Sequence, residues 1–133
     1  MSIETELKTK LSGNTALSTA CGGKIFAVLS RQPLPDKFIV FELAGFSSDD
    51  SQDEDGPESG DGTHTFNLTA YAKTYEDSLA LAALVGPAIH AGTWGAIKIQ
   101  RCVLINKIDT YNYDPEQVEN LRYGRKLTFQ ITF

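Results

Sequence analysis

Residues 63–92 read THTFNLTAYAKTYEDSLALAALVGPAIHAG, and the change of pattern within this stretch decides the fold. Every second residue from Phe66 to Ala72 is apolar, which is the period of a strand with one buried face. Residues Thr74–Asp77 then resemble a helix capping box, with aspartate where glutamate or glutamine is usual. We therefore predict a strand that leads into a helix from about residue 75 to about residue 90.

The predicted helix is apolar nearly all round, with Leu81, Leu84 and Val85 spread over its sides. A helix of this kind is buried on more than one side. In a chain this short, we expect a neighbouring subunit to cover one of those sides. Pro87 is expected to kink or end the helix, because proline removes one backbone hydrogen bond and clashes with the preceding turn.

Two helical segments are expected near the N-terminus. Ile3, Leu7 and Leu11 recur every four residues, which predicts a short amphipathic helix over residues 2–12. Residues 14–23 hold one leucine among small and polar residues and end in two glycines. That pattern is consistent with one further helical turn.

Strands are expected on both sides of the central stretch. Segments 24–29 and 37–43 are rich in Ile, Val and Phe, and the prolines between them cannot sit in the middle of a sheet. Residues 97–108 are also rich in β-forming side chains, whereas residues 111–120 read as a polar loop with Asp114-Pro115 as its turn signal. The final strand is predicted from apolar residues that alternate with polar ones, namely Leu127, Phe129, Ile131 and Phe133.

The order of these elements is helix, three strands, helix and two strands, with no repeat and no βαβα alternation. This order predicts a single α+β domain over residues 1–133. Its sheet is expected to be mixed or largely antiparallel, with about five strands and two main helices packed on one face.

Acidic residues are concentrated in one segment of the chain. The formal net charge is −5, but residues 47–62 carry seven of the 17 acidic residues, and 10 remain elsewhere against 12 basic ones. We interpret the segment as a flexible acidic loop on a nearly neutral body. A strongly basic face, which sequence-independent binding of nucleic acid needs, is not visible. The seven residues are Asp49, Asp50, Asp53, Glu54, Asp55, Glu58 and Asp61.

No catalytic, metal-binding or cofactor-binding motif is recognisable. His64 and His90 lie in no nucleophile signature and no zinc-binding spacing, and no phosphate-binding glycine loop occurs. An EF-hand register in the acidic loop would need Ser51 and Gly62 as its first and last ligands, and neither can serve. The small basic group at residues 122–126 has an aromatic neighbour, and we interpret it as a solvated face rather than a nucleic-acid contact.

The cysteines and the apolar runs of the sequence indicate the cellular compartment. Cys21 and Cys102 are far apart and read as reduced, buried thiols rather than a disulfide. The longest apolar run, Leu79 to Ile89, is too short to span a bilayer, and the first residues do not resemble a secretory signal. We expect a protein made and kept in a cytosol, without membrane contact.

Four segments carry a resemblance to the tail-terminator, or tail-completion, family of long-tailed phages and prophages: LSGNTALSTACGGKIF, LPDKFIVFEL, THTFNLTAYAKTYEDSLALAALV and YDPEQVENLRYGRKLTFQITF. The most telling features are the Leu34-Pro35 turn, Tyr71 ahead of the helix start at Tyr75–Asp77, and Tyr113-Asp114-Pro115 ahead of an arginine-bearing final strand. Compared with that family, the acidic segment 47–62 is long and the final turn carries the insert QVENL.

The resemblance implies an α+β subunit that forms a ring, typically hexameric, without cofactor or catalysis. Such a ring caps the finished tail tube, ends tail polymerisation and provides the surface that docks to the head. The implied partners are copies of this chain, the tail tube protein and the head-tail connector protein, and DNA passes without sequence-specific binding. The implied location is the virion tail, assembled in the cytoplasm of the bacterial host.

Two alternatives stand beside this interpretation. One is another neck or minor tail component, such as a head-tail joining or head-completion protein. The more remote one is a small metal-dependent enzyme, which would require His64, Asp61 and a cysteine to converge in space.

Rings close through heterologous contacts, in which a patch on one subunit meets a different patch on the next. The apolar helix and the aromatic final strand are the candidate subunit interface. The acidic loop is a candidate to line the lumen, where its carboxylates would repel DNA phosphate, or to meet a basic patch on the connector or tube. The candidate interface residues are Leu81, Leu84, Val85, Phe129 and Phe133.

Overall fold

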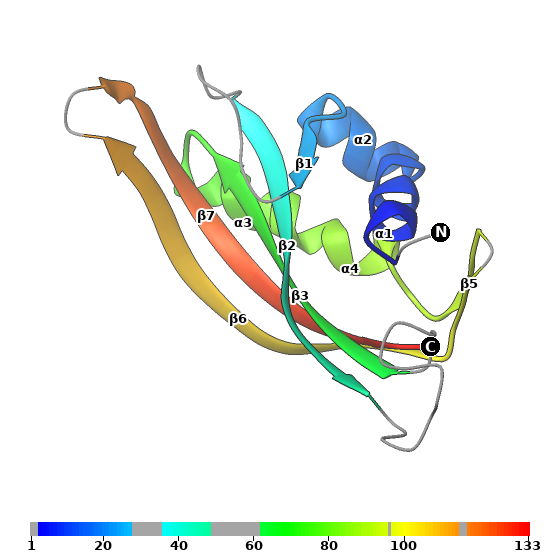
Figure 1. Cartoon of the computed structure of the whole chain (residues 1–133). Coiled ribbons are helices and arrows are strands. Elements are labelled where there is room, and N and C mark those ends of the chain that lie inside the picture. Colours follow the sequence, from blue (N-terminus) through cyan, green and yellow to red (C-terminus); the bar gives the residue numbers. More distant parts are fainter. Residues whose placement is uncertain (1–2, 28–35, 49–61, 96, 115–116) are drawn as a thin grey trace.

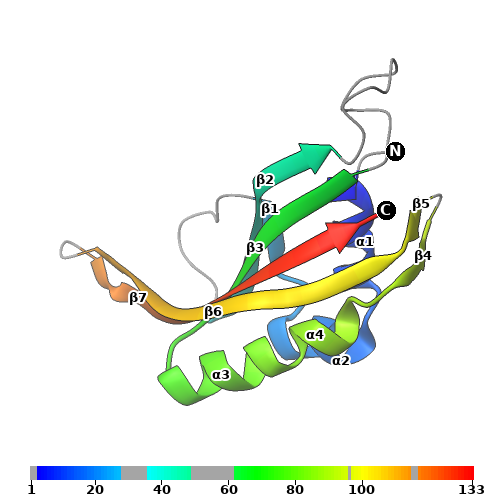
Figure 2. The same ribbon diagram turned by 90° about the horizontal axis from the view of Figure 1, so that it is seen from below.

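The computed structural model describes residues 3–27, 36–48, 62–95, 97–114 and 117–133. They form a five-stranded mixed sheet in the order β1-β2-β3-β7-β6, with the helices on one face (Figures 1 and 2). This architecture confirms the predicted α+β class. The helices are α1 (Ile3–Ser12), α2 (Thr15–Cys21), α3 (Tyr75–Ala83) and α4 (Val85–Ala88). The strands are β1 (Ile25–Ala27), β2 (Lys37–Ser48), β3 (Gly62–Ala72), β4 (Gly92–Trp94), β5 (Ile97–Ile99), β6 (Arg101–Asp114) and β7 (Gln117–Thr132).

The two N-terminal helices match the sequence pattern. Ile3, Leu7 and Leu11 are all buried, so the four-residue period of α1 is its core-facing stripe. α2 begins where the Asn14 side-chain oxygen accepts a hydrogen bond from the Leu17 backbone N–H at 2.9 Å. It ends at a glycine with φ of 61°, a left-handed conformation that favours glycine.

β3 is the centre of the sheet and carries the alternation predicted for it. It lies between β2 and β7 and is antiparallel to both, whereas β1 runs parallel to β2. Phe66, Leu68, Ala70 and Ala72 have no exposed surface. The hydrophobic core is therefore built between this face of the sheet and the helices that cover it.

The helix after β3 starts as predicted and is interrupted before its end. The Thr74 hydroxyl accepts a hydrogen bond from the Asp77 backbone N–H at 3.2 Å and caps α3. A break at Leu84 separates α3 from α4. Pro87 accounts for the break, because it cannot donate a hydrogen bond to the Ala83 carbonyl and its ring crowds that carbonyl.

Two predicted loops are shorter than expected. The polar loop predicted at 111–120 is wrong in its bounds, because β6 runs to Asp114 and β7 begins at Gln117. The register shifts between the pairs Asn112–Arg122 and Asp114–Gln117, so residues 118–121 of β7 form an irregularity within the paired strands. The acidic loop predicted at 47–62 is also shorter, because β2 and β3 pair as far as Ser48 and Gly62. In both places cross-strand pairing extends through polar residues that read locally as loop.

A small second sheet of β4 and β5 was not predicted. Trp94 in β4 is buried, and its indole N–H donates to the His90 carbonyl at 2.8 Å. Gly95 follows with φ of 59°, and a Cβ atom there would overlap the carboxylate of Glu6. This turn therefore favours glycine for its left-handed conformation, and the buried Glu6 side chain would have to shift to admit a Cβ atom.

Within the described ranges, no helix is long and apolar enough to cross a membrane.

Candidate assembly surface

Exposed apolar side chains gather on β6. Of the seven large hydrophobic residues that are exposed in the described part of the chain, four lie on this strand. Their exposed fractions are 43% for Leu104, 48% for Ile105, 51% for Ile108 and 69% for Tyr111. Such a concentration on one element marks a candidate contact surface.

The position of β6 explains this exposure. β6 is the last strand of the sheet and pairs with β7 on one side. Figure 2 shows β6 running along the outside of the sheet, with α3 and α4 below it in this view. The outer backbone groups of an edge strand can pair with another strand, so a long apolar edge favours association.

A β-bulge distributes the apolar side chains of β6 in several directions. Leu104 lies opposite Phe129 and Asn106 opposite Thr128, which leaves Ile105 as the extra residue. Beyond the bulge, Ile108 pairs directly with Lys126, and directly paired residues share a face of the sheet. Lys126 alternates with the core-facing Leu127, so both Lys126 and Ile108 lie on the face without helices. The strand therefore offers apolar surface on both faces and at its edge.

A polar network joins β6, β7 and the start of α3. The Tyr75 hydroxyl donates to Asp109 Oδ2 at 2.8 Å, and Arg125 Nε donates to Asp109 Oδ1 at 2.9 Å. Arg125 Nη2 also lies 3.3 Å from the Tyr75 hydroxyl. The hydrogen bond from Tyr75, and then that from Arg125, lower the pKa of Asp109 below its ordinary value. These contacts orient the β6 edge relative to the helices.

Aromatic rings pack on the face of the sheet that carries no helix. The ring centroids of Phe26 and Phe38 are 6.2 Å apart, and those of Phe38 and Tyr71 are 5.0 Å apart. Tyr71 lies directly over Gly124 of β7, where a Cβ atom would come within 2.8 Å of the tyrosine ring. Glycine is therefore needed at this position so that the aromatic ring can lie flat on the sheet.

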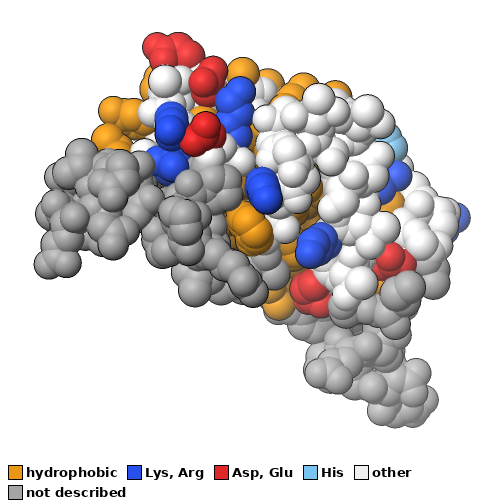
Figure 3. Space-filling model, turned by 90° about the horizontal axis from the view of Figure 1, so that it is seen from above, with side chains coloured by type: hydrophobic (Ala, Val, Ile, Leu, Met, Phe, Trp, Pro, Cys, Tyr) orange, Lys and Arg blue, Asp and Glu red, His pale blue; other side chains and the backbone are white. Residues whose placement is uncertain are grey.

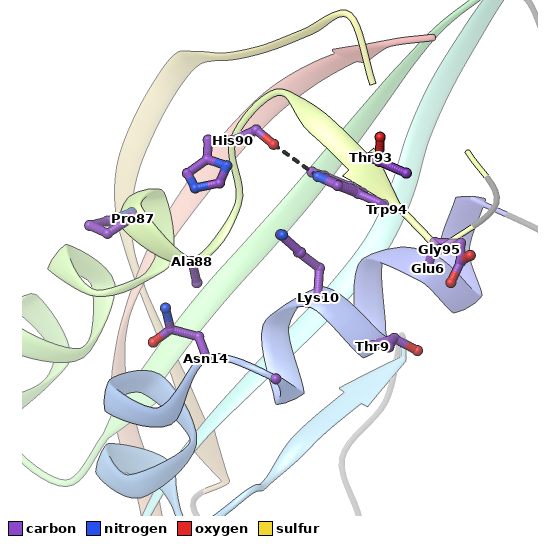
Figure 4. Close-up of a pocket in the computed structure, with 11 residues that line it drawn as sticks. Glu6, Thr9, Lys10, Asn14, Pro87, Ala88, His90, Thr93, Trp94 and Gly95 are labelled. Carbon is purple, nitrogen blue, oxygen red and sulfur yellow. Dashed lines mark hydrogen bonds between the residues drawn. The ribbon is translucent and has the colours of Figure 1, made fainter. Parts of the chain in front are cut away.

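An open pocket of about 290 Å³ lies between α1 and the α4–β4 segment (Figure 4). Lys10, Asn14, His90 and Trp94 are among its lining residues. Two of its polar groups have structural roles, because Asn14 caps α2 and the Trp94 indole donates to a backbone carbonyl. Glu6, Thr9 and Thr93 also line the pocket, so it is a surface groove of mixed polar and apolar character.

The structure places most of the predicted subunit interface inside the subunit itself. Leu81, Val85 and Phe129 are buried in the core, and Leu84 and Phe133 are partly buried against it. The reason is that α3 and α4 are covered by the sheet on one side and by α1 and α2 on another. The subunit therefore covers this apolar helix by itself, and three of the five predicted residues cannot reach a neighbour.

The acidic residues predicted to face a lumen or a partner lie outside the described residues. They are Asp49, Asp50, Asp53, Glu54, Asp55, Glu58 and Asp61.

The basic group near the C-terminus does not form one patch. Arg122 is buried and donates from Nη1 to the Leu121 carbonyl at 2.9 Å, whereas Arg125 is bound to Asp109. Lys126 follows Arg125 in the strand and so lies on the opposite face. Figure 3 likewise shows Lys and Arg side chains interspersed with acidic ones.

His64 and Cys21 have local packing roles, whereas Cys102, which was predicted to be buried, is only half-buried. His64 stacks on Phe133 with ring centroids 5.0 Å apart, and burial lowers its pKa. Cys21 donates from Sγ to the Leu17 carbonyl at 3.2 Å, and both cysteines are free. Where side chains are described, no group of three or more His, Cys, Asp or Glu residues could hold a metal ion.

Sequence reasoning missed the β6 edge, although a signal was present. Polar and charged residues interrupt the apolar ones between Arg101 and Asp114, in the run RCVLINKIDTYNYD. A strand buried on both sides would carry a more continuous apolar run. This interruption indicates a strand with solvent on one or more sides.

The comparisons with known proteins point to a shared fold. The structure is similar to a chain of the virion of a native gene transfer agent particle, with a TM-score of 0.68 and 13% sequence identity. The similarity covers 98% of this chain and 92% of that chain. No model of a protein family matches the sequence, and no curated protein matches it.

Proposed function

We propose that this chain is a structural virion protein of the phage type, and more specifically a tail terminator. In this role it forms a ring, expected to be a hexamer, that caps the tail tube, ends tail polymerisation and offers the docking surface for the head. The observation that carries the virion role is the fold shared over nearly the whole chain with a protein of a gene transfer agent virion. The terminator role in particular rests on the sequence resemblance.

The β6 edge supports an assembly role. A ring subunit needs a patch that meets a different patch on the next copy. The exposed residues Leu104, Ile105, Ile108 and Tyr111 supply apolar surface along the β6 edge, and Asp109 connects this strand to the start of α3. We assign one side of the ring contact to this edge, in place of the buried residues of α3 and α4.

The partners of the proposed ring are other copies of this chain, the tail tube protein and the head-tail connector protein. DNA passes through the ring without sequence-specific binding. The acidic segment at 49–61 carries seven carboxylates that either repel DNA phosphate from the lumen or bind a basic patch on the tube or connector. The site of action is the virion tail, and assembly takes place in the host cytoplasm.

Electron microscopy of purified tail tubes assembled with and without this protein tests the proposal. Tubes of uniform length with a defined end structure are expected only when the protein is present. Tubes whose length and ends are the same in both samples would exclude the terminator role.

A second readout separates the terminator from another neck component. Heads are added to tubes of defined length, and head joining is scored with and without the protein. If the protein promotes joining without changing tube length, it is a head-tail joining or head-completion protein rather than a terminator.

A further inference from the structure

The middle of β6 is complementary to itself in the antiparallel direction. Lys107, Ile108 and Asp109 are all exposed on the outermost strand of the sheet. We propose that two copies of this chain associate through their β6 strands, which run antiparallel with Ile108 of one copy directly opposite Ile108 of the other.

The charges select this register. When two identical strands pair about a two-fold axis through one residue, the residue before it lies opposite the residue after it. An axis at Ile108 places Lys107 of each copy opposite Asp109 of the other, so two pairs of opposite charge form. An axis at Lys107 or at Asp109 would instead place two like charges directly opposite, which is unfavourable.

The backbone geometry allows the same register. From Asn106 to Asn112, β6 pairs with β7 without a register shift, whereas shifts occur on both sides of this run. Pairing centred on Ile108 uses residues 106–110 of both copies, which lie within the regular run. Ile108 is 51% exposed in the single chain and would lose much of that exposure against its counterpart.

The side chains that would form the charge pairs can do so. Within the described parts of the chain, Lys107 forms no ion pair. Asp109 accepts hydrogen bonds from Tyr75 and Arg125, and a carboxylate has room for about four. The network around Asp109 also holds the strand in place, so little ordering is needed when the two edges meet.

The consequence is one continuous sheet across two copies, with both β6 edges covered. Once the outer backbone groups of β6 pair with a second copy, they cannot pair with any other strand. The dimer is therefore a state of the chain before it binds other partners, and it excludes other contacts of β6. The inference does not depend on the proposed function, because it concerns the purified chain alone. If a ring forms through the same edge, the dimer must first dissociate.

Cysteine cross-linking of the purified full chain tests the register. Residues directly opposite in an antiparallel pair have Cα atoms about 4.5–5.5 Å apart, within disulfide range. We expect Ile108→Cys chains to form a disulfide dimer on mild oxidation. The native chain is the background control, since Cys21 is buried and burial raises the pKa of Cys102 to about 11, which makes both thiols slow to react.

Two matched variants on the same face of β6 sharpen the test. In the proposed register Asn106 lies opposite Thr110, so two Asn106→Cys chains place their thiols four residues apart, about 13 Å. Asn106→Cys and Thr110→Cys should therefore cross-link poorly alone and readily when mixed. Ile108→Cys should cross-link at least about tenfold faster than Asn106→Cys, because only the former brings identical residues within disulfide distance. Equal cross-linking rates for Ile108→Cys and Asn106→Cys would overturn the proposal. A mixture of Asn106→Cys and Thr110→Cys chains that forms no disulfide dimer would also overturn it.

Charge reversal gives an independent readout. Lys107→Glu in the Ile108→Cys chain replaces both pairs of opposite charge in the dimer with pairs of like charge, Glu opposite Asp109. We expect this repulsion to slow the cross-linking of the Ile108→Cys chains. Lys98→Glu makes the same change in charge on β5, away from the β6 edge, and should leave the rate unchanged. Equal rates for both variants would contradict the role of the charge pairs in setting the register.

Discussion

β3 and β6 are both long strands rich in apolar side chains, yet they occupy opposite situations in the sheet. β3 is paired on both sides and covered by helices, so its core-facing residues have no exposed surface. β6 is paired on one side, and four of its large apolar residues are exposed. The difference shows that place in the sheet, more than composition, decides whether a strand stabilises the subunit or offers a contact surface.

Placing the same charge in both regions tests the comparison most strongly. Leu81 lies in the core above the central strands, and Leu81→Asp would bury an unpaired carboxylate at a cost of roughly 4 kcal/mol or more, enough to unfold a marginal domain. Ile108→Asp adds the same charge at the exposed edge and should change the stability of the single chain by about 0.5 kcal/mol or less, when protein concentrations are too low for two β6 strands to associate. Urea denaturation followed by circular dichroism measures both. Similar losses for the two variants would remove the distinction between core and edge.

A second prediction concerns the turn that holds α1 against the small sheet. Gly95→Ala should destabilise the chain by about 1–3 kcal/mol, because the left-handed backbone disfavours alanine and the new Cβ overlaps the Glu6 carboxylate. Gly86→Ala in α4 is the matched control, since no atom lies within 4 Å of its new Cβ and alanine favours a helix. Thermal unfolding of both variants measures the difference. An unchanged melting temperature for Gly95→Ala would contradict this account of the turn.

Gly124 tests the sheet face that lies between the two regions. Gly124→Ala should cost about 1–3 kcal/mol, because the new methyl group displaces the ring of Tyr71 from its place on the sheet. In a Tyr71→Ala background the same glycine substitution should cost less, since the clash is gone. A double-mutant cycle from denaturation curves gives the coupling between the two positions. Additive effects would show that the ring does not require glycine there.

The smallest effect is expected at the exposed network on β6. Because the pKa of Asp109 is lowered in the folded chain, its contribution to stability is present above the unfolded pKa and is lost as pH falls through the folded pKa. Tyr75→Phe removes the largest cause and should move the pKa of Asp109 back toward its ordinary value. An NMR titration of the Asp109 carboxyl carbon measures this. An identical titration curve in the native chain and the variant would contradict the assignment.

Local sequence patterns predicted the elements whose burial follows a simple period. The alternation in β3, the four-residue stripe of α1 and the capping box at Thr74 all correspond to the structure. The break near Pro87 also followed from the chemistry of proline. In each case the signal lies within a few residues of the feature that it predicts.

Features that depend on long-range pairing were not predictable in the same way. Residues 111–120 read as a loop, but β6 and β7 extend into this segment and pair as far as Asp114 and Gln117. Leu81 and Val85 appeared too apolar for one subunit to cover, because the sequence does not show that α1 and α2 return over α3 and α4. The β6 edge was missed because the polar residues that interrupt its apolar run indicate contact with solvent but do not show that β6 is the last strand of the sheet.

The central claim is that the β6 edge is an assembly surface of a tail-terminating subunit. The most direct measurement is the length distribution of tail tubes assembled with the native chain and with folded Ile108→Asp, scored by electron microscopy. We predict uniform, capped tubes with the native chain and long, uncapped tubes with the variant. Equal capping by both chains would contradict the assignment of the edge, and tubes unaffected by either would contradict the terminator role.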